Sequence, residues 1–347
     1  MDEITFNKLL DAAIAAPSAD NSQPWQYQYH ENTLTLSIDP KRSGSVSDAR
    51  FILSDLAIGA VIENIVLTAQ NLGLDCDIQF QLSGQNPYKV ASLTFRETTS
   101  EKNTLADHIG NRRTDRRFPW KGPVTDNTKQ MLSDVINNFG HNKLLWASGK
   151  KEKSGLGKIM ANAEKLRYTH KGLHDELFNS ICWDKGWSDY CEEGLSLPNL
   201  AVEPPARPFF SLMRNWNAQK ILNLFGSAQM LGVRSVRLPV ALSPALCCLV
   251  TSDTSRSGII GTGRAMQRFW LKATELGLSV QPFAAAGIYS LGFIEADSLL
   301  ADRFATIQDA LKEFTGSDQA VMFFRAGYSS PVKTLNKRRA RESFLKK

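Results

Sequence analysis

The stretch NRRTDRRF, residues 111–118, is the most unusual part of this sequence and the best starting point for its interpretation. Four arginines occupy the six positions 112–117, Thr114 lies among them, and Pro119 follows directly. Guanidinium groups bind phosphate oxygens bidentately, and a hydroxyl group can add another donor. The stretch therefore suits a dianionic ligand, although a solvated basic loop is the simpler interpretation when it is considered alone.

A second stretch, PSADNSQPW at residues 17–25, follows a segment with helical periodicity. The two stretches together resemble the FMN-dependent nitroreductase family. That family carries an R-[RH]-[ST]-x-[RK]-x-F segment, matched here by RRTDRRF at 112–118, and a P-S-x-x-N-x-Q-P-W segment, matched at 17–25. The chain is similar in particular to the long, single-chain branch of Acg-type proteins, over most of its length.

The resemblance implies a set of flavin-binding residues. Arg112, Arg113 and Thr114 would bind the FMN phosphate, and Arg116 would lie near the N1/O2 edge of the ring. The ring would also contact the second stretch and a short loop whose backbone N–H groups face N5 and O4; this loop has Ala286-Gly287 where the family commonly has Glu-Gly. A basic C-terminal group would reach the same phosphate, with a solvated tail as the alternative. The remaining implied residues are Pro17, Ser18, Ala19 and Asn21 at the ring, and Lys337, Arg338 and Arg339 at the phosphate.

The function implied by the resemblance is that of an FMN-dependent NAD(P)H oxidoreductase. FMN would accept hydride from NADH or NADPH and then reduce a nitroaromatic, a quinone or a similar acceptor by a ping-pong mechanism. Flavin N5 would carry the chemistry, so we expect no catalytic side chain. The alternative is a non-catalytic protein that sequesters FMN, which the missing acidic residue before Gly287 favours.

Composition limits the other possibilities. The chain has 347 residues, of which 42% are hydrophobic, and a net charge of +6 from 41 basic and 35 acidic residues. The basic excess lies mainly at 112–117 and 333–347, so a nucleic-acid partner would rest on charge alone. His170 and His174 are one helical turn apart, but no acidic residue shares their helical spacing, so we expect a surface or capping role for them rather than a metal site.

Five cysteines form an odd count without a C-x-x-C pair, which predicts buried free thiols rather than a disulfide framework. The N-terminus does not resemble a signal peptide, and no apolar run is long enough to span a bilayer. We therefore expect a cytoplasmic protein with a small-molecule acceptor, and with neither nucleic acid nor membrane as a partner.

Hydrophobic periodicity predicts several elements. Helices are expected at 5–16, capped by Thr5, and at 55–72, which is apolar nearly all round and hence central. Further helices are expected at 127–139, 156–168, 172–181 and 263–277, and strands at 25–29, 33–38, 76–82, 90–96, 245–251 and 323–328.

The segments 59–74 and 263–278 match in register, including Gly59 with Gly263 and Gly73 with Gly277. This match predicts an internal duplication. The family resemblance implies an α+β, nitroreductase-like fold, which we expect here as two halves, 1–105 and 106–347, each with a largely antiparallel sheet layered with helices. Each half keeps one of the two motifs, so a single flavin site is expected at the seam of a monomeric pseudo-dimer or a weak homodimer. Residues 150–214 would form an insertion or a lid, with Trp183, Trp187 and Tyr190 as candidate lid aromatics or ordinary packing residues.

Overall fold

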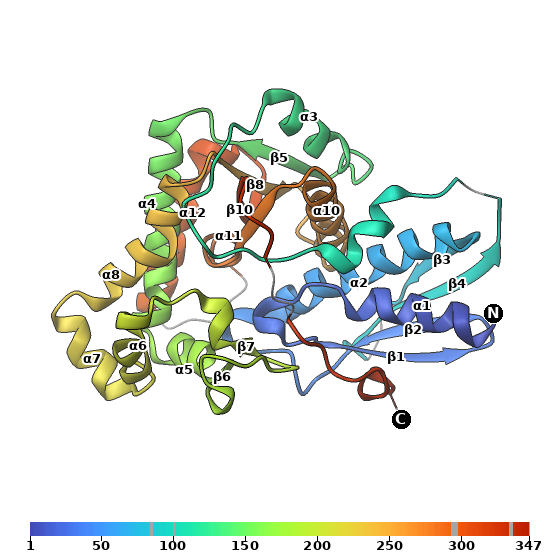
Figure 1. Cartoon of the computed structure of the whole chain (residues 1–347), viewed down its shortest axis with the longest axis horizontal. Coiled ribbons are helices and arrows are strands. Elements are labelled where there is room, and N and C mark those ends of the chain that lie inside the picture. The colour runs from blue at the N-terminus through green and yellow to red at the C-terminus, as the bar shows by residue number, and fades with distance from the viewer. Residues whose placement is uncertain (84–85, 100, 293–297, 333–335, 347) are drawn as a thin grey trace.

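The computed structural model describes residues 1–83, 86–99, 101–292, 298–332 and 336–346, and it contains two four-stranded antiparallel sheets (Figure 1). The first sheet has the order β1-β2-β4-β3 and the second the order β5-β8-β10-β9. The first half consists of α1 (Glu3–Ile14), β1 (Trp25–His30), β2 (Thr33–Ile38), α2 (Ile52–Asn71), β3 (Leu74–Phe80) and β4 (Lys89–Glu97). The α+β class and the antiparallel sheets predicted from the sequence are confirmed.

The second half repeats this order with additions. It consists of α3 (Asp126–Asp134), β5 (Asn142–Trp146), β8 (Ala245–Thr251), α10 (Arg256–Glu275), β9 (Ser279–Phe283), α11 (Ala285–Ser290), α12 (Ser298–Thr315) and β10 (Gln319–Gly327). Pairing β1 with β5, β2 with β8, β3 with β9 and β4 with β10 reproduces the strand order of the first sheet in the second. This agreement supports the interpretation as a duplication; the boundary near residue 105 stays a prediction.

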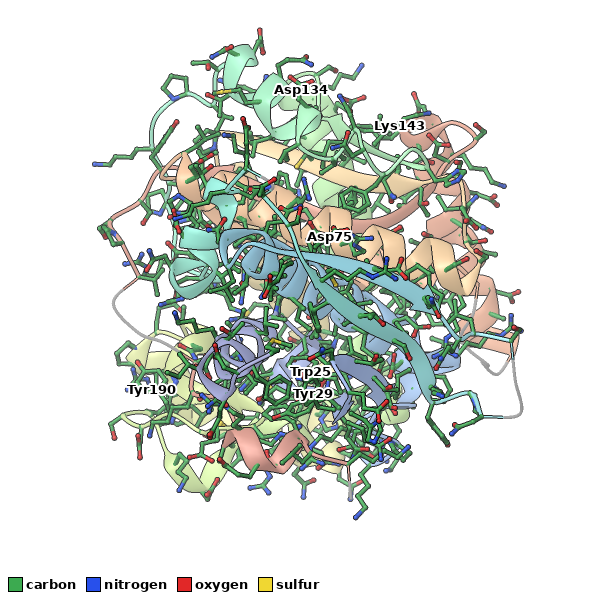
Figure 2. All side chains as sticks on the ribbon, turned by 90° about the vertical axis from the view of Figure 1, so that its right-hand side faces the viewer. Trp25, Tyr29, Asp75, Asp134, Lys143 and Tyr190 are labelled. Atoms are coloured by element: carbon green, nitrogen blue, oxygen red, sulfur yellow. A yellow bond between two sulfur atoms is a disulfide. The ribbon has the colours of Figure 1, made fainter. Side chains whose placement is uncertain are left out.

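A long segment separates β5 from β8 and has no counterpart in the first half. It contains α4 (Lys150–Thr169), α5 (Lys171–Asn179), β6 (Ile181–Cys182), β7 (Leu195–Ser196), α6 (Arg207–Leu212), α7 (Trp216–Leu224), α8 (Ser227–Gly232) and α9 (Leu238–Ala241). Trp183 and Trp187 pack in its own small hydrophobic core with Phe178 and Phe210. Figure 2 shows Tyr190 at the edge of the molecule.

The central contact of the fold is between α2 and α10, one helix from each half. The predicted central position of α2 follows from its composition: an apolar helix without a polar face must be covered all round. The span 46–71 is long and apolar enough to cross a membrane, with a mean hydropathy of 1.8, but 83% of its most apolar window is buried inside the protein. Ion pairs join the two helices at Asp55–Arg256 and at Glu63, which binds both Arg264 and Arg268.

Several local expectations are corrected. The first helix begins at Glu3 because Asp2, rather than Thr5, is its N-cap: the Asp2 carboxylate accepts from the Thr5 N–H at 2.7 Å. Cys182 and Cys191 form a disulfide, whereas Cys76, Cys247 and Cys248 are free thiols. The expectation of five free thiols is therefore wrong, because the turn between β6 and β7 brings together two cysteines that are nine residues apart.

Candidate functional site

A cavity of about 680 Å³ lies between the two halves and the inserted segment, and it is the candidate functional site. Its volume falls in the range of small-molecule sites, and both motifs line it. One wall comes from the first half (Pro17–Asn21, Leu53, Leu56, Ala57), a second from the second half (Arg112–Thr114, Arg116, Met266, Trp270, Gln281–Ala285), and a third from the insertion (Glu164, Arg167, Leu177, Phe209, Phe210, Met230, Arg234).

The arginine segment reaches the cavity because its backbone is fixed from behind. The Asp115 N–H donates to the Val280 carbonyl at 3.0 Å, which attaches the segment to the edge strand β9. Arg325 on β10 is fully buried, and its guanidinium donates to the Arg117 carbonyl at 2.7 Å while lying 3.7 Å from the ring centre of Trp120. Arg117 itself pairs with Asp115 at 2.9 Å and does not line the cavity. Three of the four arginines are left facing the ligand space.

Arg112 is the most enclosed of these arginines. Its side chain is buried and lies 4.5 Å from the ring centre of Trp270. One terminal nitrogen donates to the Ala15 carbonyl at 3.3 Å, but the buried Nε has no partner. A buried, unsatisfied donor on a cation is costly, so this position calls for an acceptor that the protein itself does not provide.

Arg338, from the C-terminal segment, joins Arg112 and Arg113 at the same end of the cavity. The segment reaches this place because Phe344 stacks on Trp25 and the Lys346 N–H donates to the Tyr27 carbonyl. Within the described residues, none of these three arginines pairs with a carboxylate. Burial and the charges of its two neighbours lower the pKa of Arg112 to about 9, and burial and Arg113 lower that of Arg338 to about 10. Three unneutralised guanidinium groups form a site for a multivalent anion.

The second motif forms a short 3-10 turn, Ala19–Asn21, with positive φ at Asp20 and Asn21. Asn21 positions its surroundings: its Oδ1 accepts from Arg338 at 2.8 Å, and its Nδ2 donates to the Glu192 carbonyl at 3.2 Å. The fully buried Gln23 donates to the same carbonyl at 2.7 Å. The motif therefore connects the C-terminal arginine to the disulfide-bonded turn of the insertion.

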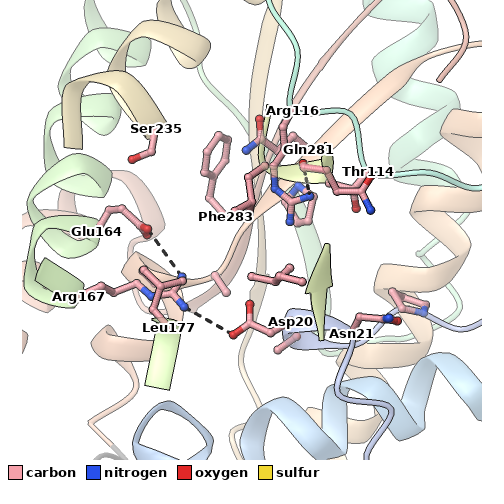
Figure 3. Close-up of a pocket in the computed structure, with 18 of the residues that line it drawn as sticks. Asp20, Asn21, Thr114, Arg116, Glu164, Arg167, Leu177, Ser235, Gln281 and Phe283 are labelled. Carbon is pink, nitrogen blue, oxygen red and sulfur yellow. Dashed lines mark hydrogen bonds and ion pairs between the residues drawn. The ribbon is translucent and has the colours of Figure 1, made fainter. Parts of the chain in front are cut away.

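Opposite the arginines, a charged row crosses the cavity wall (Figure 3). Arg167 lies 3.7 Å from Glu164 and 3.6 Å from Asp20. Burial raises the pKa of Glu164, although Arg167 opposes the shift. The row of Glu164, Arg167 and Asp20 gives this end of the cavity mixed charge, and Phe283 and Leu177 supply apolar wall. Arg116 lies beside Thr114 and Gln281 in Figure 3; it donates to the Asn199 carbonyl at 3.2 Å, and burial lowers its pKa.

Nine of the thirteen predicted binding residues line the cavity, and four do not. The nine are Pro17, Ser18, Ala19, Asn21, Arg112, Arg113, Thr114, Arg116 and Arg338. Ala286 and Gly287 lie inside α11, where Gly287 packs against the Val321 backbone so closely that a Cβ would be 2.2 Å from its carbonyl oxygen. Ala284 and Ala285, just before them, line the cavity instead. Ala286 and Gly287 therefore do not line the cavity, and their contact with a flavin stays a prediction.

The other two residues are basic but lie elsewhere. Lys337 is 3.5 Å from Asp189 at the surface, and Arg339 donates to the Gln23 carbonyl at 2.8 Å and lies over the Phe344 ring at 4.2 Å. Neither residue lines the cavity: Arg339 holds the C-terminal segment against the second motif, and Lys337 lies in an exposed ion pair. His174 is buried against Phe178 and Trp216 and contacts the Met213 carbonyl at 2.8 Å through Nε2, which gives it a packing role.

Sequence reasoning missed Glu164, Arg167 and Arg325. Glu164 and Arg167 are three positions apart within the predicted helix 156–168, but nothing in that spacing indicates a cavity. A signal existed for Arg325, since a single charge in the apolar strand sequence AVMFFRAG requires a buried partner.

Comparison with known proteins shows two relatives in Mycobacterium tuberculosis. No family model matches the chain. An uncharacterized protein is 24% identical over 346 residues, which are 98% of this chain and 48% of that protein. The putative NAD(P)H nitroreductase Acg is 30% identical over 195 residues, 55% of this chain and 56% of Acg. This chain is a distant homologue of Acg. It spans about half the length of the curated relatives that it matches.

Solved structures that resemble the chain include nitroreductase-family FMN proteins. One is a nitroreductase with bound FMN from Desulfitobacterium hafniense (TM-score 0.39, 15% identity, covering 71% of this chain and 99% of that one). Another is an iodotyrosine deiodinase bound to FMN and 3-iodo-L-tyrosine (TM-score 0.36, 14% identity, covering 68% of this chain and 94% of that one). The assignment of the site rests on the residues of this chain.

Proposed function

We propose that the chain binds one FMN in this cavity and acts as a flavin-dependent oxidoreductase. The observation that carries the proposal is the cluster of Arg112, Arg113 and Arg338, which has no carboxylate partner within the described residues. A phosphate dianion would supply the missing acceptors, including one for the orphaned Nε of Arg112.

The rest of the cavity fits a flat aromatic group attached to that phosphate. Leu56, Ala57, Trp270 and Phe283 supply apolar walls, and Thr114 offers a hydroxyl group near the arginines. Arg116 would provide the positive charge that stabilises a reduced, anionic ring. The chemistry supplied by bound FMN would be hydride transfer between NADH or NADPH and a small-molecule acceptor such as a nitroaromatic or a quinone. In the proposed pseudo-dimer, one chain supplies the whole site.

An absorbance spectrum of the purified protein tests this proposal. We expect flavin bands, present on purification or after titration with FMN at one equivalent per chain, that bleach on anaerobic addition of NADH or NADPH. Bands that persist would favour FMN sequestration over turnover. The absence of binding, or two equivalents per chain, would contradict the assignment of one site at the seam.

A further inference from the structure

Helix α7 exposes its apolar side chains to solvent. Leu224 and Phe225 at its C-terminal end are each 84% exposed, and Ile221 is 59% exposed. Leu212 at the end of α6 and Met230 on α8 are each 53% exposed. These five residues, here called the α7 surface, lie on adjacent helices of the insertion. Large apolar side chains concentrated in this way on a protein surface mark an interaction site.

The inward side of α7 carries polar as well as apolar residues. Gln219 is fully buried and donates to Asn223 at 2.7 Å, Asn223 donates to the Tyr168 carbonyl at 2.7 Å, and Leu222 packs on the core of the insertion. A surface helix normally turns its apolar stripe toward the core. Here hydrogen bonds of Gln219 and Asn223 hold part of the inward side, while the large apolar residues Ile221, Leu224 and Phe225 face outward and are left for a partner.

The charge of the region indicates which kind of partner fits. Residues 204–252 contain five basic residues and no acidic residue, and one of the five, Arg234, pairs with Glu203 just before this range. Arg214, two residues before α7, and Lys220, on α7, are both exposed. Exposed apolar residues flanked by exposed cations match an anionic lipid surface, in which apolar side chains enter the acyl boundary and cations meet the headgroups.

We propose that the α7 surface binds the face of an anionic lipid bilayer. Figure 1 shows α7 at the left edge of the molecule, at the opposite end from the N-terminus, so a flat membrane could reach it without contacting the sheets. A second copy of the chain fits less well, because a two-fold contact would bring the same cations together. We expected no membrane partner because no uninterrupted apolar run suggested a bilayer-spanning helix; the one span that is long and apolar enough, 46–71, is mostly buried, and neither observation tests for surface binding.

Membrane binding would also orient the cavity. Met230 belongs to the α7 surface and lines the cavity as well, together with its neighbour Leu231. The wall formed by the insertion would therefore lie beside the lipid. This consequence concerns the placement of the cavity only, and lipid binding itself does not depend on the proposed flavin chemistry.

Co-sedimentation of the full chain with vesicles tests the proposal, using phosphatidylcholine alone and phosphatidylcholine mixed with phosphatidylglycerol. We expect binding to the anionic vesicles that weakens at high salt. The double variant Leu224→Ser with Phe225→Ser should bind more than about tenfold more weakly. Lys220→Gln should weaken binding about fivefold. The matched controls are Ile4→Ser, which changes a 70% exposed apolar residue on α1, and Lys312→Gln on α12; both should bind like the wild type.

Three outcomes would overturn the proposal. One is no sedimentation of the wild-type chain with anionic vesicles. Another is equal binding to neutral vesicles, because the cations would then have no role. The third is a dimer in size-exclusion chromatography that dissociates in the Leu224→Ser, Phe225→Ser variant, which would assign the surface to a second copy. Because every substituted residue is exposed, the thermal unfolding temperature of each variant should equal that of the wild type. This measurement also shows that each variant is folded.

Discussion

Gly59 of α2 and Gly263 of α10 face each other where the two central helices cross. A Cβ on Gly59 would lie 2.2 Å from the Ile260 carbonyl oxygen and 2.8 Å from the Gly263 Cα, and a Cβ on Gly263 would lie 2.2 Å from the Leu56 carbonyl oxygen. The same two glycines coincide when segments 59–74 and 263–278 are aligned. Residues that match between the two segments thus meet at the crossing, as the proposed duplication with a pseudo-two-fold axis would require.

The crossing makes a prediction about stability. Gly59→Ala should lower the free energy of unfolding by about 1–3 kcal/mol, because a methyl group would push the two backbones apart. The matched control is Gly261→Ala in α10, near the crossing in sequence. A Cβ on Gly261 would meet no atom of another element within 4 Å, so this variant should raise the free energy of unfolding by about 0.5–1 kcal/mol. Denaturant unfolding of both variants measures the difference. An equal change in the free energy of unfolding for Gly59→Ala and Gly261→Ala would show that the helix crossing has room for a methyl group.

The arginine cluster predicts how FMN affinity responds to substitution. Arg112→Ala and Arg338→Ala should each weaken FMN binding by about 1.5–3 kcal/mol, because each removes a charge-assisted contact to the phosphate. Riboflavin, which lacks the phosphate, should lose little affinity in the same variants. Arg96→Ala, an exposed arginine on β4, is the control. Fluorescence titration measures the dissociation constants, and unchanged values for both cluster variants would refute the phosphate site.

Asn21 is expected to act through Arg338. Because its Oδ1 accepts from the Arg338 guanidinium at 2.8 Å, Asn21→Ala should weaken FMN binding by releasing that arginine. The double variant with Arg338→Ala should then lose less than the sum of the two single losses, by at least about 0.5 kcal/mol. Strict additivity would show instead that Asn21 contacts the flavin independently.

The disulfide predicts a redox dependence of the site. The turn closed by Cys182 and Cys191 carries the Glu192 carbonyl that accepts from Asn21 and Gln23. Cys182→Ser with Cys191→Ser should cost about 2 kcal/mol of stability and weaken FMN binding, because the turn becomes freer to leave the motif. Cys76→Ser, at a free thiol on β3, should leave FMN affinity unchanged. Calorimetric unfolding and FMN titration, with and without reductant, measure both effects.

Asp55 predicts a pH dependence of stability. Burial raises the pKa of Asp55 to about 6 from an ordinary value of 3.8, although the ion pair with Arg256 opposes the shift. The folded state thus holds the proton more tightly than the unfolded state. The resulting stability is fully present below pH 3.8 and is lost as the pH rises through 6. Asp55→Asn lacks this term, so wild-type stability relative to the variant should fall by about 2–3 kcal/mol from pH 4 to pH 7, as denaturant unfolding at each pH would measure.

Much of the secondary structure could be predicted because its causes are local. The hairpin of β1 and β2, the buried strand β8 and the central helix α2 all follow from the spacing of apolar residues. Boundaries are harder to predict where a cap decides them, as at Asp2, or where a glycine-rich start such as that of α10 is buried by its partner helix. Trp183 and Trp187, two of the predicted lid aromatics, pack on the core of the insertion, whereas Phe209 and Phe210 line the cavity. Only tertiary contacts decide which aromatic residue takes which place.

The sequence by itself determined the two motifs, the mixture of helices and strands and the central helices, since each depends on residues close together in the chain, whereas the α+β class came from the family resemblance. Only the tertiary structure decided which of those residues share a cavity. Asn21 meets Arg338 across 317 positions of sequence, and Arg325 holds the Arg117 backbone across 208. The same is true of the position of Ala286 and Gly287 inside α11 and of the exposed apolar residues of α7. Burial and long-range hydrogen bonds depend on how elements pack, and no local pattern of residue types encodes that packing.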